Sequence, residues 1–175
     1  HQEDDLIHMK KLFALVMIFS FITSLLLANS LELGSPAPKL KVFTDQRTTL
    51  NLGETLSTGT TLVFFYPKAM TPGCVKQACS LRDGWDELQS RDLRIFGVSS
   101  DTVKTQAQFR DKYTLPFTLL ADTDGKIADA FSKSRWSRQA YLFRDGILVW
   151  RDLMAATSKQ ATDVLSALDE LEPNS

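Results

Sequence analysis

Apolar and polar positions along residues 31–175 follow a pattern typical of an α/β protein. Residues 60–66 and 93–99 are apolar on both faces, as buried central strands are. Between them, residues 73–89 carry apolar side chains at spacings of three and four, which predicts a helix. The other expected elements are a hairpin over 40–43 and 48–52, a helix over 102–113 capped by Asp101, a strand over 117–120, a helix over 126–131, a hairpin over 140–144 and 147–151, and a last helix capped by Thr157 or Ser158. This order predicts a mixed central sheet flanked by helices.

An uncharged apolar stretch, residues 12–28, precedes this domain and follows Lys10 and Lys11. A basic start, an apolar middle and small residues at 28–30 form the pattern of a secretory signal peptide. The alternative is an uncleaved membrane anchor, because about 17 apolar residues lies at the lower limit for a membrane span. We expect export to the bacterial periplasm, with an anchor facing the periplasm as the alternative.

These observations divide the chain into three parts. Residues 1–8 are acidic and do not fit a signal peptide, so we interpret them as an upstream extension that is not native. Residues 9–30 form the expected signal peptide, with cleavage after Ser30. Residues 31–175 form one domain that is long enough to build a hydrophobic core.

The charge balance and the histidine content exclude several classes of function. The chain has 20 Lys and Arg against 21 Asp and Glu, with no basic block that would suggest nucleic-acid binding. Its two histidines, His1 and His8, lie outside the expected domain. That position excludes a Ser-His-Asp triad and a Cys-His hydrolase, and it argues against a zinc site. We expect no metal and no organic cofactor.

Both cysteines, Cys74 and Cys79, lie in the stretch FFYPKAMTPGCVKQACS, where a predicted strand gives way to a predicted helix. The first turn of a helix favours the nucleophilic thiolate through its unpaired N–H groups and partial positive charge. Lowering a cysteine pKa from about 8.5 to about 6 takes about 3.4 kcal/mol. A helix terminus supplies about 0.3–1 kcal/mol, and about 2 at most. A nearby cation is therefore needed, and Arg suits the task better than Lys because its fork can hold a thiolate and a substrate oxygen together.

The spacing of the two cysteines limits how they can react with each other. Five residues along a helix separate two Cα atoms by roughly 8–9 Å, whereas a disulfide needs less than about 7 Å. Cys74 and Cys79 therefore either never bond, or bond when the helix start unravels in a catalytic cycle. Other interpretations are a permanent small staple, Cys79 as a buried hydrophobe, a metal site, or a thiol-exchange pair, which would normally have two intervening residues.

The pattern Pro67-x-x-x-Thr71-x-x-Cys74 resembles the active-site signature of peroxiredoxins. The longer run YPKAMTPGC…QAC…LRD, residues 66–83, is similar to the bacterioferritin-comigratory, or peroxiredoxin Q, subfamily. The similarity extends from Gly34 to the closing helix. It implies a thioredoxin-like fold and thiol-dependent reduction of hydrogen peroxide and organic hydroperoxides.

The resemblance also assigns roles to individual residues. Cys74 would be the peroxidatic nucleophile that forms a sulfenic acid, and Cys79 would be the resolving cysteine of an intramolecular disulfide. Thr71 would hydrogen-bond the peroxide and the thiolate, and Pro67 would shield the pocket. Arg138, just before a predicted strand, matches the family's active-site arginine and would supply the cation.

Simpler interpretations remain open for several of these residues. Thr71 could only cap the helix, and Pro67 could only end the strand. Arg135 lies three residues before Arg138 and is the alternative active-site arginine. Trp136, between the two, could line the pocket or pack elsewhere.

We therefore expect an exported, monomeric thiol peroxidase that takes a peroxide as substrate and a thioredoxin-like protein as reductant. Once the signal is cleaved, we expect no stable membrane association. Two departures from the family pattern are Val75, in place of a more polar residue, and export, which puts cytosolic thioredoxin out of reach. The alternatives are an exported thiol–disulfide oxidoreductase acting on proteins and a catalytically inactive thioredoxin-fold binding module.

Overall fold

The computed structural model describes residues 31–172, so the expected extension at 1–8 and signal peptide at 9–30 lie outside the described residues. The strands of residues 31–172 are β1 (Lys41–Thr44), β2 (Thr49–Asn51), β3 (Thr60–Phe65), β4 (Leu93–Ser99), β5 (Thr118–Ala121), β6 (Gln139–Arg144) and β7 (Ile147–Asp152). The helices of the same residues are α2 (Leu52–Leu56), α3 (Pro72–Asp83), α4 (Trp85–Ser90), α5 (Val103–Tyr113), α6 (Lys126–Ala130) and α7 (Gln160–Leu171). Among these residues no helix is long and apolar enough to cross a membrane.

The strands form one mixed sheet in the order β2-β1-β5-β4-β3-β6-β7. Strands β3, β4 and β5 run parallel to one another at its centre, and the other neighbouring pairs are antiparallel. Strand β6 pairs with β3 so that Gln139 at the start of β6 lies opposite Phe65 at the end of β3. This register brings the residues just before β6 next to the loop that follows β3.

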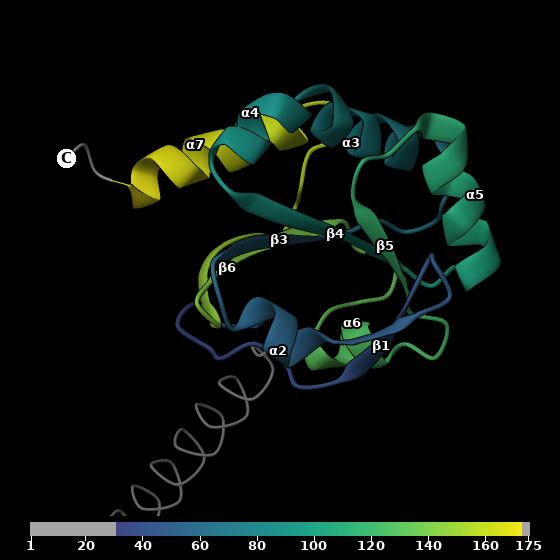
Figure 1. Cartoon of the computed structure of the whole chain (residues 1–175), viewed down its shortest axis with the longest axis horizontal. Coiled ribbons are helices and arrows are strands. Elements are labelled where there is room, and N and C mark those ends of the chain that lie inside the picture. The colour runs from purple at the N-terminus through teal and green to yellow at the C-terminus, as the bar shows by residue number, and fades with distance from the viewer. Residues whose placement is uncertain (1–30, 173–175) are drawn as a thin grey trace, which may run out of the picture. The chain divides into compact units, whose positions relative to one another are not determined.

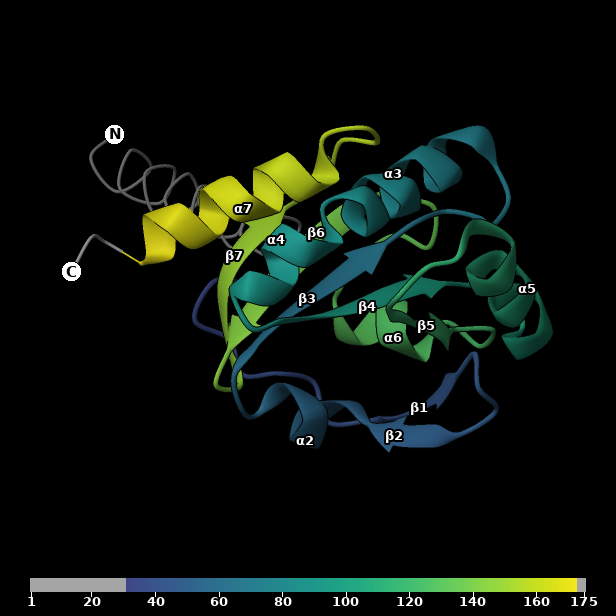
Figure 2. The same ribbon diagram turned by 45° about the horizontal axis from the view of Figure 1, so that its top comes forward.

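Alternating side chains along β3 enter two separate cores. Leu62, Phe64 and Tyr66 lie in the core that contains residues of α3, α4, α5 and α7. Val63 and Phe65 lie in the other core, with residues of α2 and α6. Figures 1 and 2 show these two sets of helices on opposite faces of the sheet. The expected mixed sheet flanked by helices is confirmed.

The single helix expected over residues 73–89 is wrong, because the structure has two helices that meet at Gly84. Helix α7 passes close to this point. A Cβ added at Gly84 would lie 2.9 Å from the Cβ of Ala161, a separation that real Cβ atoms essentially never show. The apolar periodicity continues across the break, so it could not reveal the break by itself.

Two expected helix caps are also wrong. The side chain of Thr102, not Asp101, accepts a hydrogen bond from the N–H of Thr105 at the start of α5. Helix α7 begins after Lys159, which makes no side-chain cap. The N–H of Ala161 instead donates to the hydroxyl of Ser80 on α3, at 3.1 Å. A partner distant in sequence therefore replaces the local cap of α7.

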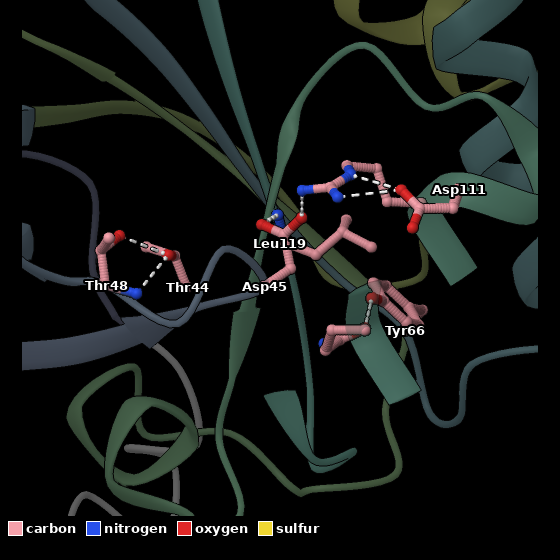
Figure 3. A network of polar contacts seen from close by, with 8 residues as sticks. Thr44, Asp45, Thr48, Tyr66, Asp111 and Leu119 are labelled. Atoms are coloured by element: carbon pink, nitrogen blue, oxygen red, sulfur yellow. Dashed lines mark hydrogen bonds and ion pairs between the residues drawn. The ribbon is translucent and has the colours of Figure 1, made fainter. Parts of the chain in front are cut away.

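A buried carboxylate fixes the turn between β1 and β2 to the rest of the domain (Figure 3). Asp45 accepts the N–H of Leu119 at 3.1 Å and forms an ion pair with Arg110 of α5. Arg110 also pairs with Asp111, at 2.8 Å. A buried carboxylate is stable only when it is paired and hydrogen-bonded, and Asp45 has both kinds of contact.

Candidate active site

Cys74 lies in the first turn of α3, where the chain leaves the central strand β3. Helix α3 starts at Pro72, which has no N–H and suits the first helical position. The Cys74 side chain is buried, with 1% of the residue exposed. The first N–H groups of a helix have no acceptor within the helix and carry a partial positive charge. The sulfur therefore lies buried at the electropositive start of a helix, beside N–H groups that can donate to an anion.

Arg138 supplies the cation beside this sulfur. Its Nη2 lies 3.5 Å from the Cys74 Sγ, and its Nη1 donates to the Oε1 of Gln77, one turn further along α3. A Cβ added at Gly73 would lie 3.2 Å from Arg138 Nη2, so glycine leaves room for the guanidinium. The pairing of β6 with β3 explains how a residue so far along the chain reaches Cys74.

Arg135 lies elsewhere. A Cβ added at Gly125 would lie 2.8 Å from Arg135 Nη2, so this guanidinium packs against the turn before α6. Of the two candidate arginines, the structure brings Arg138 to Cys74. Trp136 is 65% exposed and does not pack into the core.

The loop between β3 and α3 contains the other two expected site residues. Pro67 is half-buried, two residues after the end of β3. Thr71 precedes α3, but its side chain makes no capping hydrogen bond, so the interpretation of Thr71 as a plain side-chain cap is wrong. Its hydroxyl donates instead to the carbonyl of Lys68 at 2.8 Å, which leaves the oxygen lone pairs able to accept a hydrogen bond from a ligand.

Asp101 anchors this loop, a role that the sequence did not reveal. Its Oδ2 accepts the N–H of Ala69 and the hydroxyl of Ser99, both at 2.7 Å. The next residue, Met70, has a φ of 66°, in the left-handed region. Asp101 therefore holds the chain where it turns toward Cys74.

Cys79 is half-buried on the same helix, and both cysteines are free thiols. Burial raises the pKa of the Cys79 thiol, and nearby Arg82 opposes the shift. Because both cysteines lie within the intact helix α3, the expected separation holds in this conformation. A disulfide between them requires the helix to unwind.

Two buried glutamines near Arg138 were also missed. Gln77 and Gln160 are both 0% exposed, and the Nε2 of Gln77 donates to the Oε1 of Gln160 at 2.7 Å. The spacing of three residues between Cys74 and Gln77 places both on one helix face, a signal that was present in the sequence. No local pattern connects Gln160 to them. Residues 31–172 contain no cluster of His, Cys, Asp or Glu that could hold a metal ion.

The sequence model of the AhpC/TSA family matches residues 33–151, which include Cys74, Cys79 and Arg138. The chain belongs to the AhpC/TSA family. Peroxiredoxin Bcp of Escherichia coli is 38% identical to this AhpC/TSA protein over 121 residues, covering 68% of this chain and 76% of the relative. Peroxiredoxin Bcp of Bacillus subtilis is 39% identical over 102 residues, covering 58% of this chain and 64% of the relative.

Solved structures agree with this assignment. The crystal structure of peroxidoxin BcpB from Mycobacterium tuberculosis has a TM-score of 0.74 and 27% identity, covering 81% of this chain and 99% of that one. A variant of peroxiredoxin Q from Xanthomonas campestris has a TM-score of 0.70 and 25% identity, covering 76% of this chain and 92% of that one. The resemblance to the bacterioferritin-comigratory subfamily and the thioredoxin-like fold are confirmed. The AhpC/TSA protein is a thiol peroxidase, and neither alternative function is favoured.

Proposed function

We propose that this protein reduces hydrogen peroxide and organic hydroperoxides with Cys74 as the attacking thiolate and Cys79 as the resolving thiol. The observation that carries the proposal is the contact of 3.5 Å between the Arg138 guanidinium and the buried Cys74 sulfur. A cation beside a sulfur at a helix start is the environment that an activated cysteine needs. Membership of a peroxidase family supports the same reaction.

In the first step, the Cys74 thiolate attacks the terminal oxygen of the hydroperoxide. A sulfur–oxygen bond forms as the oxygen–oxygen bond breaks, which leaves Cys74 as a sulfenic acid. The departing alkoxide or hydroxide takes a proton from water and leaves as an alcohol or as water. Arg138 and the N–H groups at the start of α3 stabilise the negative charge that moves onto that oxygen.

Thr71 and Pro67 orient the substrate in this proposal. The Thr71 hydroxyl already donates to Lys68, so its oxygen can accept a hydrogen bond from the O–H of the incoming hydroperoxide. Pro67, without an N–H group, covers the site without offering a competing hydrogen-bond donor.

In the second step, α3 unwinds and the Cys79 sulfur attacks the Cys74 sulfur. The disulfide forms, and the hydroxide released from Cys74 combines with the Cys79 proton as water. Unwinding exposes Cys79 to solvent, which removes the burial that raises its pKa and increases its fraction of reactive thiolate. A thioredoxin-like dithiol then reduces the disulfide by exchange and leaves with a disulfide of its own.

We further propose that the protein works as a monomer in the periplasm. A disulfide within one helix needs no second chain, which supports a monomer. The signal-like pattern of residues 9–30 supports export. Cell fractionation and N-terminal sequencing of the mature protein test export, cleavage after Ser30 and retention of an anchor, and light scattering tests the monomer.

Steady-state turnover tests the peroxidase proposal. The full chain is supplied with thioredoxin, thioredoxin reductase and NADPH, and NADPH consumption is followed with hydrogen peroxide or cumene hydroperoxide. We expect peroxide-dependent turnover that disappears in Cys74→Ser. Turnover that persists in Cys74→Ser would contradict the assignment of the nucleophile.

A further inference from the structure

We infer that Gln160 of α7 is a positioning residue for Arg138 and acts through Gln77, an inference that rests on the function proposed for Cys74. Three side chains form a chain of contacts toward the sulfur. Gln160 Oε1 accepts from Gln77 Nε2 at 2.7 Å, Gln77 Oε1 accepts from Arg138 Nη1, and Arg138 Nη2 lies 3.5 Å from Cys74 Sγ. Both glutamines are fully buried, so water does not compete for their amides.

The chemistry of the guanidinium fixes the direction of every amide in this relay. A guanidinium carries only donors, so the atom of Gln77 that faces Arg138 must be the carbonyl oxygen. The Gln77 NH₂ group then faces α7 and requires an acceptor there, which the Gln160 oxygen provides. Without that acceptor, the Gln77 NH₂ group would be buried without a partner, so the Gln77 side chain would no longer be held where its oxygen binds Arg138.

This arrangement leaves one buried donor of Gln160 without a partner in the described part of the chain. With its oxygen committed to Gln77, its Nε2 lies buried and has no hydrogen-bond partner among residues 31–172. Buried amide donors without partners are rare and unfavourable, so each one calls for a specific reason. Here the reason is the relay, because turning the Gln160 amide over would satisfy neither glutamine.

Helix α7 holds Gln160 firmly enough to serve this role. Gln160 is the first residue of α7, and the next N–H, that of Ala161, donates to Ser80 on α3. The absence of a Cβ at Gly84 lets α7 approach α3 closely at the same point. The relay therefore joins the C-terminal helix of the domain to the reacting sulfur.

The test compares Gln160→Met, which keeps the shape but loses the acceptor, with Gln160→Glu, which keeps an acceptor oxygen. Val164→Ala is the matched control, because Val164 is buried on α7 but lies outside the relay. Two rates are measured in the full chain at pH 7: peroxide consumption by stopped flow, and alkylation of Cys74 by iodoacetamide, separated from Cys79 by peptide mass. Circular dichroism confirms that each variant is folded.

We expect Gln160→Met to slow both reactions roughly tenfold, less than the roughly hundredfold that a misplacement of about 1 Å can cost. Gln160→Glu should recover most of each rate, and Val164→Ala should leave both unchanged. In a Gln77→Met background, Gln160→Met should have no further effect, because the relay is already broken.

Equal rates for Gln160→Met and wild type would overturn the inference, as would an equal slowing by Val164→Ala or a fully additive effect in the Gln77→Met background. Should the wild type fail to consume peroxide while the alkylation pattern still holds, the proposed function would fall and the relay would stand.

Discussion

Replacing Arg138 with Met removes the positive charge and the N–H donors that face Gln77 and Cys74, but it keeps an unbranched apolar stem. Arg138 Nη2 lies 3.5 Å from Cys74 Sγ, and Nη1 donates to Gln77. The substitution should therefore leave the fold intact and destabilise both the thiolate and the transition state of the first step.

The geometry sets the size of this effect. Opposite unit charges 3.5 Å apart attract by about 1.2 kcal/mol in bulk water and about 4.7 kcal/mol at an effective dielectric constant of about 20. The Arg138 side chain is partly exposed, so a value between these limits applies. A loss of about 2–3 kcal/mol corresponds to a peroxide reaction slower by about 30- to 160-fold.

Stopped-flow mixing of the reduced full chain with hydrogen peroxide measures the second-order rate constant directly. Arg135→Met is the matched control, because that arginine lies against Gly125, away from the sulfur. We expect the Arg135→Met protein to react with hydrogen peroxide at the rate of the wild type. A rate within threefold of wild type for Arg138→Met, or an equal loss in Arg135→Met, would refute the electrostatic role of Arg138.

Three further predictions concern dynamics and stability. Oxidation should increase hydrogen exchange over residues 73–81 and at the Ala161 N–H, whose acceptor Ser80 lies next to the segment that must unwind; unchanged exchange would rule out unwinding. Burial lowers the pKa of Lys133 from 10.5 to about 8, so the folded protein loses this proton at a lower pH than the unfolded chain does. The unfolding free energy, measured by urea denaturation at several pH values, should then rise from pH 8 to 10.5 more steeply in wild type than in Lys133→Met. The same pH dependence in both proteins would contradict this prediction. Asp45→Ala should cost about 2–3 kcal/mol of stability, because it leaves the Leu119 N–H and Arg110 without their buried acceptor; a loss below about 0.5 kcal/mol would contradict this reason.

Most of the fold could be predicted because the periodicity of the chain is strong. The β-branched and aromatic run that forms β3 is apolar on both faces and contains no helix period. The break at Gly84 could not be predicted, because the apolar periodicity continues across it, and the close approach of Ala161 that requires a glycine there comes from a helix distant in sequence. The cap of α7 was missed for the same reason, since Ser80 provides it from α3.

In the candidate site, too, residues of a local sequence pattern could be predicted, and residues brought in by tertiary packing could not. Cys74, Thr71 and Pro67 form one local pattern, and an activated cysteine without a histidine nearby requires an arginine or lysine as its cation. Gln160 has no sequence relation to Cys74 and reaches the site only through the packing of α7 on α3. Asp101 was expected as a helix cap, because nothing in the sequence shows that the loop at Ala69 lies beside the end of β4.

The proposed reaction has two steps at its core, the oxidation of Cys74 by peroxide and the closure of Cys74 onto Cys79. Single-turnover mixing of the reduced full chain with one equivalent of hydrogen peroxide, followed by intact-mass analysis and peptide mapping, tests it most directly. We expect rapid loss of peroxide, a protein lighter by two hydrogen atoms, and a disulfide between Cys74 and Cys79. Two free thiols and unconsumed peroxide after mixing would contradict it.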